Sequence, residues 1–165
     1  MCMAKPRTSP PSRLQAELHQ KKAFHSASQE GAIGIVRTAD LLRRRFSRFV
    51  EPHGISGQQY NVLRILRGAA PETLPTLTIA DRMIEQTPGI TRLLDRLERK
   101  GLVRRERCVR DRRQVLCEIT PKGLALLETL DAPISRADDE ALAGISGADL
   151  KTLIRILDAV REHHT

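Results

Sequence analysis

The apolar positions of the chain fall mostly into stripes with the period of an α-helix. Between residues 32 and 50 they recur at alternating spacings of four and three, which predicts one amphipathic helix. This stripe consists of Ile35, Ala39, Leu42, Phe46 and Phe49. A second stripe, between residues 88 and 100, consists of Ile90, Leu93, Leu94 and Leu97. Shorter or longer helices of the same kind are predicted near residues 57–68, 76–83, 121–134 and 147–160.

Residue types that begin and end helices mark the boundaries of these stripes. Ser56 with Gln59 three residues later has the form of a capping box. Thr87 as N-cap, Pro88 at the first helical position and Gly101 just past the end delimit the helix over 88–100. Three similar N-terminal signals are Thr76 or Thr78, Thr120 before Pro121, and Ser146 with Asp149. Pro133 is expected to bend the helix that follows Thr120.

The helical period breaks after Gly101. Residues 102–108 and 114–119 read as two short strands joined by a polar tip at 109–113. In such a hairpin Cys108 faces residue 114 and Cys117 faces residue 105, so the two cysteines are not positioned to form a disulfide. The predicted order is helix, helix, short helix, well-capped helix, hairpin, helix, helix. This is a mostly α fold with a small β-hairpin.

Charge suggests what the fold is for. The chain carries a formal net charge of +8 and has a pI near 10.1, a balance that favours polyanionic partners. Residues 82–113 contain 11 basic and 5 acidic side chains, a local excess of +6. A solvated surface would spread such charges over all helices, whereas concentration on one helix and one hairpin indicates contact with phosphates.

Two short helices in tandem, followed by an arginine-rich hairpin, make a winged helix-turn-helix. The helix over 88–100 would enter a major groove of double-stranded DNA, and the hairpin would act as a wing that reaches the backbone or the minor groove. Aromatic residues make up only 2% of the chain, which disfavours a stacking surface for single-stranded nucleic acid. No nucleophile, P-loop or zinc motif is present, so an enzyme is not expected.

Candidate DNA-binding residues lie on the predicted recognition helix and on the wing. Arg92 and Arg96 could contact bases or phosphates, although Arg96 could instead pair with Glu98. Asp111 could hold Arg113 or another wing arginine, or simply form the turn. Thr87 could contact DNA or only cap the helix. The full set is Thr87, Pro88, Gly89, Thr91, Arg92, Arg96, Arg110, Asp111, Arg112 and Arg113.

Several segments, occurring in order, resemble the multiple-antibiotic-resistance regulator (MarR) family of bacterial winged-helix transcription factors. They are ISGQQYNVLRIL (55–66), TRLLDRLE (91–98), GLVRR (101–105), DRR (111–113) and ITPKGL (119–124). The resemblance runs from about residue 32 to the end of the chain. The chain departs from it in the turn before the recognition helix, which often contains glycine in this family and here reads Ile84-Glu85-Gln86.

This resemblance implies a homodimer that binds a palindromic operator, probing adjacent major grooves with its recognition helices. It implies that Asp111 and Arg113 form the Asp-x-Arg pattern of the wing. It also implies a repressor modulated by a small apolar or phenolic ligand; the alternative is an architectural DNA-binding protein without an effector. The implied division is a helical dimerisation region at 31–50 and 120–165 and a DNA-binding domain at 51–119.

The remaining features call for no further chemistry. Residues 1–30 are expected to be a disordered tail (1–13) and a loosely ordered arm (14–30). No stretch is long and apolar enough for a membrane span, and the N-terminus lacks the apolar run of a secretory signal. Three cysteines without C-x-x-C spacing fit a reducing cytoplasm, with the protein at the bacterial nucleoid. Neither a metal nor a cofactor is expected, and redox sensing by Cys108 or Cys117 is a lesser alternative to simple packing.

Overall fold

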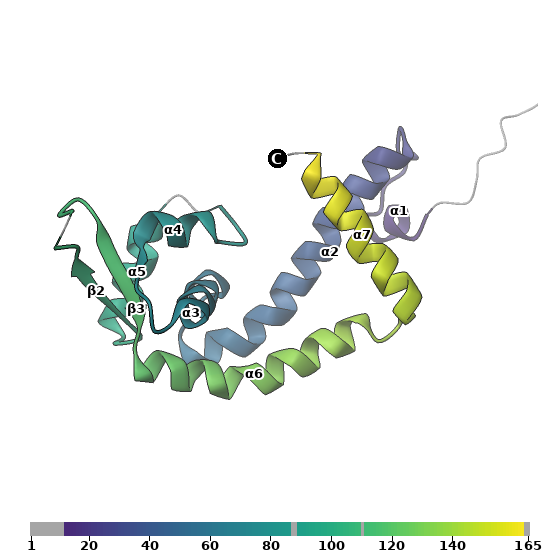
Figure 1. Cartoon of the computed structure of the whole chain (residues 1–165). Coiled ribbons are helices and arrows are strands. Elements are labelled where there is room, and N and C mark those ends of the chain that lie inside the picture. Colours follow the sequence, from purple (N-terminus) through teal and green to yellow (C-terminus); the bar gives the residue numbers. More distant parts are fainter. Residues whose placement is uncertain (1–11, 87–88, 110, 164–165) are drawn as a thin grey trace, which may run out of the picture. The chain divides into compact units, whose positions relative to one another are not determined.

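The computed structural model describes residues 12–86, 89–109 and 111–163 (Figure 1). The chain divides into two compact units, residues 1–43 and residues 44–165, and each is described by itself. Within the described residues no helix combines the length and the apolar character needed to cross a membrane. The fold is mostly helical, with one small antiparallel sheet.

The first unit contains α1 (Arg13–Glu17) and the larger part of α2 (Ala27–Val50). Ser12 caps α1 by accepting a hydrogen bond from the backbone N–H of Gln15 at 3.2 Å. The helix α2 begins at Ala27, five residues earlier than the apolar stripe predicts, and the expected loosely ordered arm at 14–30 is therefore partly helical. The reason is local, because the Oγ atom of Ser26 accepts from the backbone N–H of Gln29 at 3.1 Å.

The second unit begins with the end of α2, a short 3₁₀ turn (Glu51–His53) and α3 (Gly57–Ala69). The predicted capping box is confirmed, since the backbone N–H of Gln59 donates to Ser56 Oγ at 3.3 Å and that of Ser56 donates to Gln59 Oε1 at 3.0 Å. The helix α3 runs one residue past Gly68, which was expected to end it, because Gly68 keeps a helical backbone.

The sheet has three strands in the order β1-β3-β2, all antiparallel. The hairpin of β2 (Val103–Arg107) and β3 (Val115–Ile119) is the predicted wing. Its register is confirmed: Arg105 lies opposite Cys117, and the backbone N–H of Cys108 donates to the carbonyl of Gln114 at 3.0 Å. The third strand, β1 (Leu74–Pro75), lies between the helices predicted near 57–68 and 76–83, where no strand was predicted.

Two predicted helix starts are wrong. The helix α5 (Ile90–Arg99) has Gly89 as its N-cap, with φ at +113°, instead of Thr87. A positive φ favours glycine and is not a right-handed helical conformation, so the helix begins after Gly89. The helix α4 (Thr76–Asp81) follows Pro75 without a side-chain cap. Thr76 Oγ1 donates instead to the carbonyl of Val115 at 3.2 Å, so its hydroxyl is used by the sheet.

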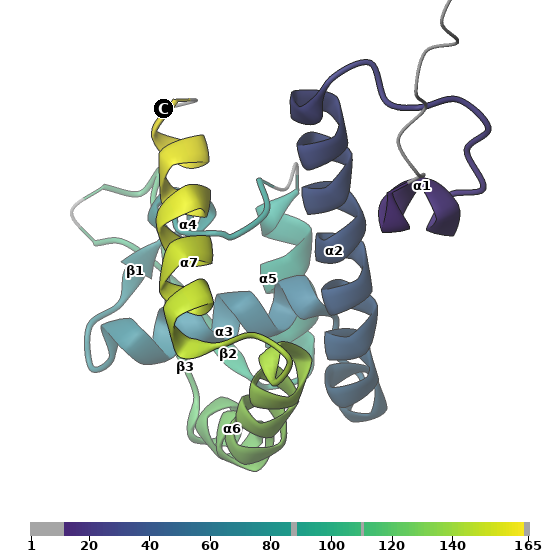
Figure 2. The same ribbon diagram turned by 90° about the vertical axis from the view of Figure 1, so that its right-hand side faces the viewer.

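The last two helices are α6 (Pro121–Leu142) and α7 (Gly147–Glu162), joined by a short turn (Figure 2). Their predicted N-caps are confirmed: Thr120 Oγ1 accepts from Gly123 N–H at 3.1 Å, and Ser146 Oγ accepts from Asp149 N–H at 3.2 Å. The helix α6 continues through Pro133. None of the described residues of α7 is buried within the single chain.

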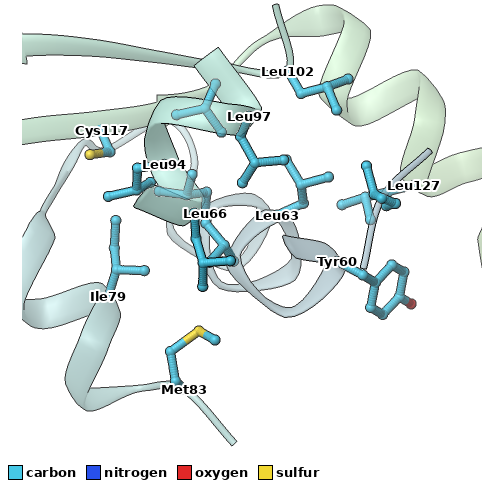
Figure 3. Packing of buried hydrophobic residues seen from close by; sticks show 14 of the residues in the cluster. Tyr60, Leu63, Leu66, Ile79, Met83, Leu94, Leu97, Leu102, Cys117 and Leu127 are labelled. Atoms are coloured by element: carbon cyan, nitrogen blue, oxygen red, sulfur yellow. The ribbon is translucent and has the colours of Figure 1, made fainter. Parts of the chain in front are cut away.

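The hydrophobic core joins α3, α5, the sheet and α6 (Figure 3). Leu63 and Leu66 of α3 face Leu94 and Leu97 of α5, and Leu127 of α6 completes this centre. All five side chains are almost completely inaccessible to solvent. Burying such side chains contributes on the order of 2 kcal/mol each. The core therefore fixes α5 and the wing as parts of one packed body.

Candidate nucleic-acid interface

The helix α5 has a buried face and a charged, exposed face. As predicted, Leu93, Leu94 and Leu97 are buried, and Ile90 packs partly against the core. The outward residues all belong to the opposite side of the helix and are exposed: Thr91, Arg92, Arg96 and Arg99. Because the apolar face locks the rotation of the helix, the three arginines point to the same solvent-facing side.

These three arginines have no acidic partner among the residues that the structure describes. Glu98, the alternative partner for Arg96, instead accepts two hydrogen bonds from Arg105, and so the alternative is not observed. Exposed guanidinium groups without partners can form bidentate contacts with guanine or phosphate oxygens without first breaking an ion pair.

Arg105 on β2 connects the wing to α5, and its role was not foreseen. Its Nη2 atom lies 2.6 Å from Asp95 Oδ1 and 2.6 Å from Glu98 Oε2, while its Nε atom donates to Glu98 Oε2 at 2.9 Å. The hydrogen bond to Glu98 raises the pKa of Arg105 above its usual value. The strand register could have indicated this role, since Arg105 pairs with the buried Cys117 and so belongs to the inward face of the sheet.

The tip of the wing is shaped by Asp111. Its Oδ1 atom accepts from the backbone N–H of Arg113 at 3.0 Å, and its Oδ2 atom accepts from the Gln114 side chain at 3.2 Å. This is the turn-forming role considered above. The expected bond to an arginine guanidinium is not observed for Arg112 or Arg113, because the carboxylate is already occupied by the turn; Arg110 lies outside the described residues. Arg112 and Arg113 are both exposed.

The start of α5 offers backbone donors. Gly89 is exposed, and the helix has no side-chain cap among the described residues. The N–H groups of a first helical turn are the groups that bind phosphates at helix N-termini. Thr91 is exposed in this first turn. Thr87 and Pro88, also expected at the interface, lie outside the described residues.

Not every basic residue in the 82–113 region is available to DNA. Arg104 pairs with Glu106 and lies 3.6 Å from Glu118 across the hairpin. Lys100 Nζ donates to the carbonyl of Gly54 at 2.7 Å. The other exposed arginines of this region include Arg92, Arg96 and Arg99 on α5, Arg112 and Arg113 at the wing tip, and Arg82 and Arg107.

Cys117 contributes to the packing of the core. Cys117 is completely buried in the sheet, and this burial raises the pKa of its thiol. A raised pKa lowers the fraction of reactive thiolate. The Sγ atom lies 3.8 Å from Thr76 Oγ1, which links β3 to the start of α4.

Comparison with known proteins agrees with this arrangement. Residues 55–115 match the model of the MarR family. A MarR transcription factor from Planctomyces limnophilus is 38% identical in sequence, with a TM-score of 0.65 over 82% of this chain and 98% of its own. A variant of E. coli MarR, solved in complex with operator DNA, is 25% identical, with a TM-score of 0.70 over 78% of this chain and 91% of its own.

A third similar structure shares the fold. It is that of Bordetella bronchiseptica BpsR, described with a mechanism for regulation of its DNA binding by 6-hydroxynicotinic acid. It is 20% identical, with a TM-score of 0.72 over 85% of this chain and 98% of its own. The winged helix, the matched family model and the 38% identity over nearly the whole Planctomyces protein together place this protein in the MarR family of transcription regulators.

Proposed function

We propose that the protein is a transcriptional repressor in the bacterial cytoplasm that binds a palindromic double-stranded DNA operator as a homodimer. The observation that carries the proposal is the outward face of α5, where Arg92, Arg96 and Arg99 are exposed and lack acidic partners among the described residues. The helix is anchored by buried leucines on its other side. A rigid helix with free guanidinium groups is suited to the major groove.

The wing supports the same function by a different contact. Asp111 fixes the turn by accepting a hydrogen bond from the backbone N–H of Arg113. The side chains of the adjacent residues Arg112 and Arg113 are both exposed to solvent. Arginines on a projecting hairpin fit the negative potential of the backbone and of a narrow minor groove. We propose that the wing adds affinity for all duplexes, while α5 selects the sequence.

Uncovered apolar side chains support a homodimer. Ile154, Ile156 and Val160 of α7 are exposed, and no described residue of this helix is buried in the single chain. In the first unit, Ile35 and Leu42 of the α2 stripe are also exposed. Apolar surfaces of this kind mark interfaces. Light scattering should give twice the 18.5 kDa mass of one chain; a mass of one chain at micromolar concentration would contradict the dimer.

A hollow in the first unit supports an effector site. It has a volume of about 490 Å³ and is lined mainly by apolar side chains, among them Leu18, Ile33 and Val36. Arg37 also lines it and carries a buried Nε–H without an acceptor among the described residues. Small-molecule sites combine such apolar walls with a few polar groups. An apolar or phenolic molecule with a hydrogen-bond-accepting oxygen would satisfy both features.

The DNA-binding proposal is tested by selecting duplexes from a random pool with the purified protein. Arg92→Ala should weaken binding to the selected site by about 1–3 kcal/mol and relax discrimination at one position of each half-site. Arg136→Ala, which removes an exposed arginine from α6, is the matched control and should leave discrimination unchanged. Equal discrimination by the wild type and Arg92→Ala would contradict base reading by α5.

The palindrome is tested by changing its spacing. The half-sites should lie about one helical turn, roughly 10 base pairs, apart, and inserting about five base pairs rotates one of them to the other side of the duplex. Footprinting should then show loss of one half-site. Undiminished binding to the lengthened site would show that the protein does not read a palindrome as a rigid dimer.

The effector is tested with 6-hydroxynicotinic acid as the probe, because it carries both a ring and acceptor oxygens. Operator affinity should fall in the wild type as the probe is added and should change less in Arg37→Gln, which removes the guanidinium group from the hollow. An unchanged operator affinity with this probe and with simple phenols would favour the architectural alternative, a DNA-binding protein without an effector.

A further inference from the structure

Asp95 is an acidic residue within reach of two DNA-facing arginines. It lies on α5 three residues after Arg92 and four residues before Arg99. Side chains at these spacings are neighbours on a helix surface, and opposite charges placed there pair readily. If Asp95 paired with either arginine, that guanidinium group would meet DNA already neutralised. In the structure neither arginine pairs with it.

Arg105 explains why these pairs do not form. Its guanidinium Nη2 atom lies 2.6 Å from Asp95 Oδ1, and the same group holds Glu98 through Nη2 at 2.6 Å and Nε at 2.9 Å. The Arg105 side chain is 20% exposed, against 45% for Asp95. The contact is therefore formed on the protected side, where β2 meets α5, and it draws the carboxylate toward the sheet.

We propose that Arg105 is a positioning residue for DNA binding, which holds the carboxylate of Asp95 against the wing and so keeps Arg92 and Arg99 unpaired for phosphate or base contacts. This inference rests on the proposed DNA-binding function. It assigns to Arg105 a role that needs no contact with DNA, because Arg105 acts through Asp95.

The same strand supplies a matched control. Arg104 is the neighbouring residue, carries the same charge and also forms ion pairs, but with Glu106 and Glu118 of the hairpin instead of with α5. Replacing either arginine with glutamine removes one positive charge from the wing and frees acidic groups. Only Arg105→Gln frees an acid at helical spacing from the DNA-facing arginines.

The experiment measures the affinity of the full chain for its selected duplex as a function of salt concentration. If the freed Asp95 captures one arginine, Arg105→Gln should reduce the slope of log affinity against log salt by about 0.9, the value for one phosphate contact. This corresponds to binding about fivefold weaker at 0.15 M salt, with affinity at 1 M salt unchanged. Arg104→Gln should keep the wild-type slope.

Rescue separates positioning from a merely structural role. Asp95→Asn removes the charge that competes for Arg92 and Arg99, so it should restore the slope in the Arg105→Gln background and change it little in the wild type. A packing defect would not be repaired by this second substitution. Arg105→Lys provides a second test, because it keeps the charge near Asp95 while losing the two-pronged contact; its slope should lie between those of wild type and Arg105→Gln.

Each failure has a distinct meaning. Equal slopes for Arg105→Gln and Arg104→Gln, or the same effect of Asp95→Asn in both backgrounds, would overturn the role of Arg105. A wild-type protein without salt-dependent duplex binding would instead contradict the proposed function itself.

Discussion

Gly123 lies at the tightest junction between α6 and the wing, and replacing it with alanine is the sharpest test of the fold. A Cβ atom added there would overlap the carbonyl oxygen of Leu102 and lie 2.7 Å from Ile119 Cγ1. The Leu102 oxygen cannot simply move away, because it accepts the backbone N–H of Thr120 at 3.1 Å. Either α6 shifts from the sheet or this hydrogen bond is lost.

The expected change in the free energy of unfolding for Gly123→Ala is the sum of opposing contributions. Overpacking of this kind costs about 1–3 kcal/mol, and weakening the Thr120–Leu102 hydrogen bond costs about 1 kcal/mol more. The higher helix propensity of alanine offsets up to about 1 kcal/mol. The free energy of unfolding should therefore fall by roughly 1–3 kcal/mol. For a chain of this size each kcal/mol lowers the Tm by about 2–4 °C.

The assay is urea unfolding followed by circular dichroism at fixed protein concentration, with Gly68→Ala as the control. Gly68 also lies in a helix, α3, but no heavy atom lies within 4 Å of the position its Cβ would occupy. The same chemical change should therefore stabilise the protein there by about 0.4–1 kcal/mol. The two substitutions should therefore change the free energy of unfolding in opposite directions, because only Gly123 lies at the close junction. If both variants shifted stability in the same direction, the close approach of α6 to Leu102 would be refuted.

Three further predictions concern single contacts. Asp131→Asn breaks a two-pronged ion pair in which Arg67 Nη1 lies 2.7 Å from Asp131 Oδ2 and Arg67 Nη2 lies 2.9 Å from Asp131 Oδ1. This pair lowers the pKa of Asp131. The pair should contribute about 0.5–1 kcal/mol at neutral pH, given its partial exposure. The pKa of Asp131 is lower in the folded protein than in the unfolded chain, where it is about 4. The contribution should therefore be complete above about pH 4 and be lost as the pH falls through the lower folded pKa, measured by urea unfolding at several pH values. Ser56→Ala removes the cap of α3 and should cost about 1 kcal/mol in the same assay, whereas Ser56→Thr should retain most of it. Arg113→Ala should weaken binding to operator and random duplexes alike and lower the salt slope by about one; binding to random DNA that stayed unchanged would contradict the role of the wing.

The parts of the fold that the sequence predicted are those set by near neighbours. The caps at Ser56, Thr120 and Ser146 each need only a hydroxyl and a backbone N–H three residues away. The buried face of α5 follows from the spacing of its leucines. Even the facing of Cys117 and Arg105 could be predicted, because register follows once the tip of the hairpin is placed.

The parts that were missed depend on contacts between distant segments. The strand β1 has only two residues, one of them Pro75, and it exists because Leu74 pairs with Cys117 far along the chain. The ion pair between Arg105 and Asp95 forms only once β2 is packed against α5. Thr87 was preferred over Gly89 as a cap because residue preferences do not reveal that the backbone turns to a positive φ at residue 89.

The central position of β3 determines how the DNA-binding unit can move. β1 runs directly into α4, and β2 follows α5 within a few residues, so β3 is paired to the chain just before the helix-turn-helix and just after it. The hinge motion in which the wing swings while α4 and α5 stay in place would have to break one of these two pairings. The wing and the two helices are therefore expected to move together as one rigid body. Any signal that regulates DNA binding from outside this block must change where the whole block is held, because the relative placement of its reading elements is already fixed.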